Sequence, residues 1–198
     1  MSAAAISVGE IQPSWSLPYR GKVAMAGLII AESAIFTIFV VAYLFYIGKS
    51  LTGPTPREVL ETPIFFTICL LSSSLTIHYA GKFLQKGERG AFLSLWSLTI
   101  LLGGLFLFGT GQEWHRLIYE HGLTIATNLF GTTYYSLVGL HAFHVTAGMI
   151  MLVMVAIFAF AGRIGREQSH RVEVLSLYWH FVDVVWVVVF TVVYVLGR

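Results

Sequence analysis

Long uninterrupted runs of apolar residues dominate this chain. Five such runs cover approximately residues 23–47, 63–83, 91–111, 133–161 and 173–197. A run of about 18 or more apolar residues is long enough to cross the hydrocarbon core of a bilayer as a helix. Strands of a membrane barrel would instead alternate apolar and polar residues over about ten positions. The pattern therefore predicts an all-α, polytopic membrane protein with five transmembrane helices.

Short polar segments separate the five runs. Residues 53–56 (Gly-Pro-Thr-Pro) and 87–90 (Gly-Glu-Arg-Gly) carry strong turn-forming residues. The longest connection, residues 112–132, holds most of the polar residues outside the runs. Since no internal repeat or low-complexity tract is visible, we expect one membrane domain over residues 23–198, preceded by a cytoplasmic tail of residues 1–22.

Basic residues are distributed unevenly between the two sides of a five-helix arrangement. Four lie on one side, and eight lie on the side of the N-terminus: Arg20, Lys22, Lys82, Lys86, Arg89, Arg163, Arg166 and Arg171. Because Lys and Arg accumulate on the cytoplasmic side, we expect a cytoplasmic N-terminus and an external C-terminus. The tail has neither the basic-then-apolar pattern of a signal peptide nor the Arg-rich character of a transit peptide. These features favour a bacterial inner membrane.

Composition supports the membrane assignment and excludes several other classes. The chain is 57% hydrophobic and 11% charged, whereas soluble domains are roughly 45–50% and 25%. A net charge of +2 without any basic run gives no indication of a nucleic-acid partner. Cys69 is the only cysteine, which excludes a disulfide or a multi-cysteine metal site within the chain.

Small residues in the third and fourth runs predict close packing between helices. Small side chains let transmembrane helices approach one another. The residues concerned are Gly103, Gly104, Gly109, Gly139, Ala142 and Gly148.

Few ionisable residues lie inside the predicted spans, and such residues are costly enough to need a role. They are Glu32, His78, His141, His144, His180 and Asp183. A rise of about 1.5 Å per residue places Glu32, His144 and Asp183 near the middle of the bilayer, about 14–15 Å from its cytoplasmic edge. We expect a carboxylate–histidine cluster inside the bundle, formed by these three residues together with His141 and His180.

Three roles are open to this cluster. It can hold helices together, form part of a proton path, or bind a metal or haem. We favour the first of these interpretations. His141 and His144 share a helix face, as do His180 and Asp183. A di-iron centre needs Glu-x-x-His on two helices, which is absent here, whereas a haem between two histidines agrees with the spacing. An independent transporter would show inverted repeats and broken helices, and the sequence shows neither.

Two motifs carry a family resemblance. Residues 178–186, Tyr-Trp-His-Phe-Val-Asp-Val-Val-Trp, resemble the last-helix signature of subunit III of haem–copper terminal oxidases. Residues 141–148, His-Ala-Phe-His-Val-Thr-Ala-Gly, resemble the family's His-Gly-x-His-Val-x-x-Gly signature, with Ala142 in place of glycine. Residues 31–33, 70–76 and 113–114 match further family positions in order. The resemblance runs from about Gly21 to the end of the chain and fits the five-helix form of the family.

The resemblance implies a non-catalytic subunit with no catalytic, metal-binding or cofactor-binding residue of its own. Haem and copper would reside in partner subunits. The chain would stabilise subunit I, hold phospholipid and support proton uptake, with subunit II and a small subunit IV as further partners. Cytochrome c oxidase is favoured; a quinol oxidase, an accessory subunit of a nitric oxide reductase and a haem-b membrane protein are the alternatives. By position, Arg20 and Lys22 are candidates for binding lipid phosphates.

Overall fold

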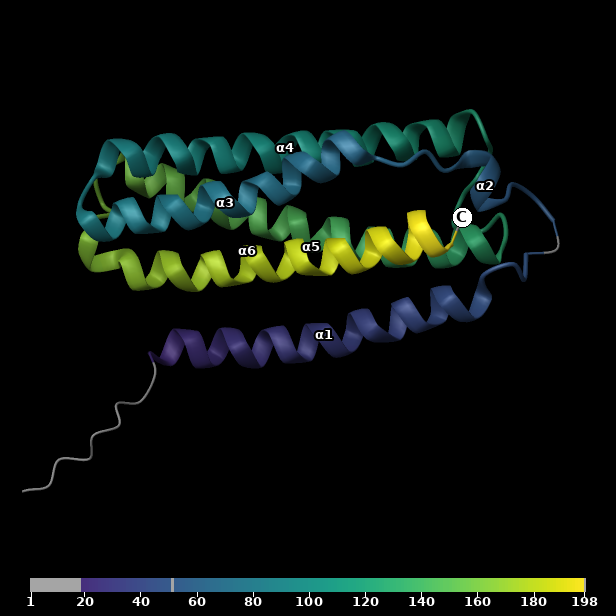
Figure 1. Ribbon diagram of the computed structural model, residues 1–198, viewed down its shortest axis with the longest axis horizontal. Helices are drawn as coiled ribbons and strands as arrows, with labels where there is room; N and C mark the ends of the chain where they lie inside the picture. The colour runs from purple at the N-terminus through teal and green to yellow at the C-terminus, as the bar shows by residue number, and fades with distance from the viewer. Residues whose placement is uncertain (1–18, 51, 198) are drawn as a thin grey trace, which may run out of the picture.

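The computed structural model describes residues 19–50 and 52–197 as a bundle of long helices (Figure 1). Five spans are long and apolar enough to cross a membrane, and no strand occurs among the described residues. The predicted fold class is therefore confirmed. The long helices are α1 (Arg20–Tyr46), α3 (Ile64–Lys86), α4 (Arg89–Tyr119), α5 (Leu129–Phe160) and α6 (Ser169–Phe190). The last span begins with a 3-10 turn, Arg166–Gln168, and ends in a π-helical segment, Thr191–Leu196.

The helices extend beyond the apolar runs at several ends. α1 begins at Arg20, within the predicted tail, whose residues 1–18 lie outside the described part of the chain. The connection predicted at residues 112–132 spans only residues 120–128, because α4 and α5 continue into it. Gln, Glu and Arg are good helix formers, so a helix can continue after it leaves the hydrocarbon. Hydrophobicity marks the membrane crossing and not the end of the helix.

A short helix that the apolar pattern does not predict, α2 (Pro56–Val59), lies in the connection between α1 and α3. Its first residue is a proline, which suits the first helical turn because no hydrogen bond is lost there. The backbone N–H of Thr55 donates to Glu58 Oε2 at 2.9 Å. This bond lowers the pKa of the Glu58 carboxyl.

α1 is the least enclosed helix of the bundle and lies at its edge (Figure 1). It packs on α5 and α6, whereas α3 and α4 form an antiparallel hairpin. Only 11% of the most apolar stretch of α1 is buried, against 50% in the last span. The hairpin turns at Gly87, whose left-handed φ of 83° lets Glu88 N–H donate to Phe83 O at 2.9 Å.

Three fully buried tryptophans form hydrogen bonds between neighbouring helices. Trp96 Nε1 on α4 donates to Leu152 O on α5 at 2.9 Å. The indoles of Trp179 and Trp186 on α6 donate to α3, to Ser73 Oγ at 2.8 Å and Thr67 Oγ1 at 3.2 Å respectively. Each indole thus buries its apolar rings while its N–H has a partner, as buried tryptophans require.

The Trp179 indole occupies a space left by two glycines. A Cβ atom on Gly148 of α5 would lie 2.9 Å from Trp179 Cε3 and Cζ3, and one on Gly103 of α4 would lie 3.0 Å from Trp179 Cζ2. Two of the small residues singled out in the sequence therefore do permit close packing. They accommodate a large side chain from a third helix.

Candidate functional site: polar groups inside the bundle

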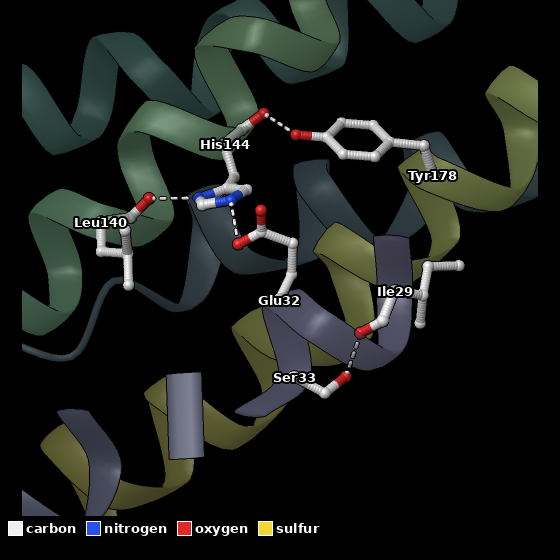
Figure 2. Close-up of polar contacts among 6 residues, drawn as sticks. All are labelled: Ile29, Glu32, Ser33, Leu140, His144 and Tyr178. Carbon is white, nitrogen blue, oxygen red and sulfur yellow. Dashed lines mark hydrogen bonds and ion pairs between the residues drawn. The ribbon is translucent and has the colours of Figure 1, made fainter. Parts of the chain in front are cut away.

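The first polar group joins α1 to α5 and α6 (Figure 2). Glu32 Oε2 on α1 lies 3.1 Å from His144 Nε2 on α5. His144 Nδ1 lies 2.8 Å from Leu140 O, one turn earlier on α5. The Tyr178 hydroxyl on α6 donates to His144 O at 3.2 Å. The side chains of His144 and Glu32 are only 9% and 23% exposed, so this contact is largely enclosed.

These contacts determine how the pair shares its protons. A carbonyl oxygen only accepts, so the hydrogen bond to Leu140 O requires a hydrogen on His144 Nδ1. The bond between Nε2 and Glu32 Oε2 then contains one proton, which makes either an ion pair or a neutral acid–imidazole pair. Both forms have zero net charge, which reduces the cost of placing two ionisable groups inside the membrane.

The second polar group joins α3 to α6. The Ser74 hydroxyl on α3 donates to Asp183 Oδ2 on α6. The same hydroxyl lies 3.0 Å from His180 Nδ1. Asp183 is almost fully buried, and its second oxygen, Oδ1, has no hydrogen-bond partner among the described residues. The His78 ring on α3 lies 6.4 Å from the His180 ring, centroid to centroid.

His141 belongs to neither group. Its ring stacks on Trp186 at a centroid distance of 4.9 Å, with Phe106 edge-on at 5.8 Å. Both ring nitrogens are buried and lack a hydrogen-bond partner in the described part of the chain. The expectation of one cluster was therefore wrong. Residues three apart on a helix differ by about 60° around its axis, so His141 and His144, at similar depth, face different neighbours.

A third group lies near the C-terminal end of α4 and was not among the predicted site residues. The Tyr194 hydroxyl, in the π-helical segment, donates to the carboxylate of Glu113 on α4, at 3.0 Å from Oε1 and 2.9 Å from Oε2. The Tyr134 hydroxyl on α5 lies 3.5 Å from that of Tyr194. Glu113 falls just beyond the third apolar run, so a hydropathy criterion leaves it outside the membrane. Its place beside Trp114 in the family motif was the available signal.

The two residues proposed for lipid phosphates lie at the N-terminal end of α1. Lys22 Nζ forms an ion pair with Glu173 Oε1 on α6 at 2.7 Å, with both side chains 37% exposed. Arg20 is exposed. The ammonium of Lys22 therefore already has a counter-charge, whereas Arg20 keeps its guanidinium at the surface.

The arrangement of these polar groups is suited to holding helices together and to sharing protons locally. Among the described residues, no three His, Cys, Asp or Glu side chains gather as a metal-ion site. Each of the three hydrogen-bonded groups crosses from one helix to another. Such cross-helix hydrogen bonds are a common means of fixing membrane helices relative to one another.

Comparison with known proteins decides the family. The profile of the family described as cytochrome c oxidase subunit III matches residues 21–198. The chain belongs to the cytochrome c oxidase subunit III family. Subunit 3 of the Synechocystis cytochrome c oxidase is 37% identical, over 85% of this chain and 72% of its own. Subunit 3 of the Alkalihalophilus pseudofirmus cytochrome c oxidase is 34% identical, over 84% of this chain and 82% of its own. Subunit 3 of the Pseudomonas aeruginosa cytochrome bo(3) ubiquinol oxidase is 31% identical, over 85% of this chain and 81% of its own.

Membership confirms the resemblance seen in the two sequence motifs. The protein is subunit III of a respiratory haem–copper oxidase, and cytochrome c oxidase is the commoner name among its relatives. It is a multi-pass protein of the bacterial inner membrane, as its five apolar spans and bacterial relatives indicate. As a subunit III it works within a multi-subunit oxidase.

Proposed function

We propose that this subunit braces the catalytic subunit I of its oxidase and takes no redox step itself. The observation that supports the proposal is that the hydrogen-bonded polar groups inside the bundle connect helices to one another. Glu32 ties the loosely packed α1 to His144, and Ser74 ties α3 to α6. A rigid bundle with apolar outer faces presents a stable surface to a membrane partner.

Subunit I is the proposed direct neighbour, with subunit II and a small subunit IV in the same assembly. The proposal extends to bound phospholipid, for which the exposed Arg20 provides a basic group at the cytoplasmic boundary. It also extends to support of proton uptake by subunit I on that side. The electron donor we propose is cytochrome c, in line with the Synechocystis and A. pseudofirmus relatives.

A quinol donor is the second candidate, because the P. aeruginosa relative is named as a subunit of a ubiquinol oxidase. Oxygen consumption by the purified complex distinguishes the two. Reduced cytochrome c should support rapid turnover and a soluble quinol should not. The reverse result would assign the complex to the quinol oxidases.

The bracing role is tested by purifying the tagged chain from native membranes in mild detergent. A reduced-minus-oxidised spectrum is recorded before and after a harsher detergent wash. We expect the haem bands to disappear together with the partner subunits. We also expect the oxygen-consuming activity of the complex to decline faster when this subunit has been removed than when it is present. Haem that stays with the isolated chain would make its histidines ligands and overturn the proposal.

A further inference from the structure

One of the six ionisable residues singled out inside the spans is both exposed and unpaired. The other five are buried or half-buried in the bundle, whereas the imidazole of His78 on α3 is exposed. Its ring lies 5.6 Å from that of Tyr79 and 6.4 Å from that of His180, centroid to centroid. It takes part in no hydrogen bond or ion pair with a described residue. His180 also lines a groove between α1 and α6, yet it has a partner in Ser74 at 3.0 Å.

The depth of His78 makes this exposure costly. Ser74, one turn earlier on α3, donates to Asp183, which the helical rise places about 15 Å from the membrane edge. Four residues advance a helix by about 6 Å, so His78 lies about 9 Å inside that edge. Lipid chains offer no hydrogen-bonding group at such a depth, and ionisable side chains in spans almost always face protein or a water-filled cavity. We therefore expect another protein chain to cover this part of α3 in the assembled oxidase.

The exposed side of α3 has the spacing of a helix-packing seam. α3 packs against α4 and α6, and on its remaining side exposed residues recur at alternating intervals of four and three positions. This heptad spacing is that of two helices packed along their length in a left-handed pair, as in most transmembrane bundles. The spacing suits a lipid-facing surface as well, and His78 distinguishes the two because lipid leaves its imidazole unpaired. The seam consists of Ile64, Ile68, Leu71, Leu75, His78 and Lys82.

The charges at one end of the seam indicate the chemistry of its partner. Lys82 follows His78 by one turn and is exposed. Its ammonium lies 5.6 Å from the centre of the Tyr79 ring, and no carboxylate of the described residues pairs with it. A neutral imidazole has one N–H donor and one acceptor nitrogen, and a carboxyl group can bond to either. A carboxyl group would also balance the charge of the lysine, which a hydroxyl or an amide would not.

We propose that the seam of α3 docks a transmembrane helix of a neighbouring oxidase subunit, and that an Asp or Glu of this helix pairs with His78 beside Lys82. The proposal rests on the bracing role, because it names the face by which this subunit holds its partner. A single polar residue in an apolar seam fixes the register of the two helices. A second copy of this chain fits less well, because a symmetric pair of parallel α3 helices would place each basic end against its own copy.

Photo-crosslinking in the complete oxidase tests the docking face. A benzophenone side chain replaces either Leu71 or Leu75 in the seam, and Ile150 on α5, which is 58% exposed, is the control position. We expect both seam positions to cross-link to one transmembrane segment of another subunit, with an Asp or Glu within one turn of the attachment point. Ile150 should not cross-link to that segment.

Other cross-linking results would overturn the docking face. Lipid adducts alone at the seam, attachment to a second copy of this chain, or a cross-linked segment without Asp or Glu would each refute it. Cross-links to another subunit from Ile150 alone would move the contact to α5 and leave the bracing role intact. If neither helix cross-linked to another subunit, the bracing role would fail as well.

Variants of His78 test the hydrogen bond. His78→Phe keeps an aromatic ring, and this subunit should leave the purified complex about fivefold faster in the harsher detergent, the ratio that one cross-helix hydrogen bond supplies. His78→Gln keeps a donor and an acceptor and should restore most of the retention. Thr146→Val, which removes an exposed hydroxyl from α5, should change nothing. Equal losses in His78→Phe and His78→Gln would refute the pairing.

A double-variant cycle tests the partner's carboxyl group. Replacing the cross-linked segment's Asp or Glu by Leu should have about the same effect as His78→Phe, and combining the two should add little, because both remove one contact. Additive losses would show that the two residues do not meet. If His78→Phe fails to assemble, the cross-links from Leu71 and Leu75 still decide the proposal, because those chains keep His78.

Discussion

Gly148 offers a direct test of the packing around Trp179. In Gly148→Ala the new Cβ would lie 2.9 Å from two atoms of the Trp179 six-membered ring. The indole cannot easily move away, because it is fully buried and its Nε1 is held by Ser73 Oγ at 2.8 Å. Gly103 also faces the same indole, so a shift toward α4 meets another close contact.

The magnitude follows from two opposing effects. Overpacking a tight interior costs about 1–3 kcal/mol, whereas replacing a helical glycine by alanine gains about 1 kcal/mol. Gly139→Ala is the matched control on the same helix, since its Cβ would lie 3.6 Å from Trp114, an ordinary contact. The difference between the two variants cancels the helix-propensity gain. We expect Gly148→Ala to be less stable than Gly139→Ala by about 1–3 kcal/mol.

Stability is measured by denaturant titration of the purified chain in mild detergent, with tryptophan fluorescence and circular dichroism as signals. A Trp179→Leu background should remove most of the penalty of Gly148→Ala, because the ring that it meets is gone. Equal stability of the Gly148 and Gly139 variants would refute the packing argument. So would an undiminished penalty in the Trp179→Leu background.

Three further predictions concern hydrogen bonds and turns, and the same titration measures each. Glu32→Leu should destabilise the chain by about 1–3 kcal/mol, because it leaves His144 Nε2 unpaired. Glu32→Gln can still hydrogen-bond and should cost much less. Equal losses of stability in the two variants would contradict the pairing of Glu32 with His144. Tyr194→Phe should cost about 1–3 kcal/mol by removing the donor to a partly buried carboxylate, and an unchanged midpoint would exclude that contact. Gly87→Ala should cost about 1–2 kcal/mol through its left-handed backbone. Gly90→Ala, in helical backbone with open space around it, should instead leave the chain as stable or slightly more stable.

Sequence reasoning located the polar residues of the site but not their partners. Depth along each helix placed Glu32, His144 and Asp183 in one layer, and this depth estimate depends only on the helical rise. Which of them meet depends on the rotation of each helix about its axis, and α5 directs His144 to Glu32 while α6 directs Asp183 to Ser74. An apolar run gives little information about that rotation when lipid and protein both favour apolar side chains.

The contact between Tyr194 and Glu113 shows the same limit. A π-helical turn alters the side-chain directions expected from α-helical periodicity, and the structure places Tyr194 within such a turn. No pattern of apolar residues along the last run indicates where the π-helical segment begins.

The sequence by itself determined the number of spans, the all-α class and the family. The number of spans and the all-α class follow from the length of the apolar runs, because a chain inside the bilayer must hydrogen-bond all its backbone groups internally and a helix does so. The family follows from two specific motifs. Only the tertiary structure decided that the intramembrane polar residues form separate groups, that glycines on two helices accommodate one indole, and that His180 lines a groove between α1 and α6. Those features depend on contacts between residues far apart in the chain, which packing between helices fixes and local sequence does not.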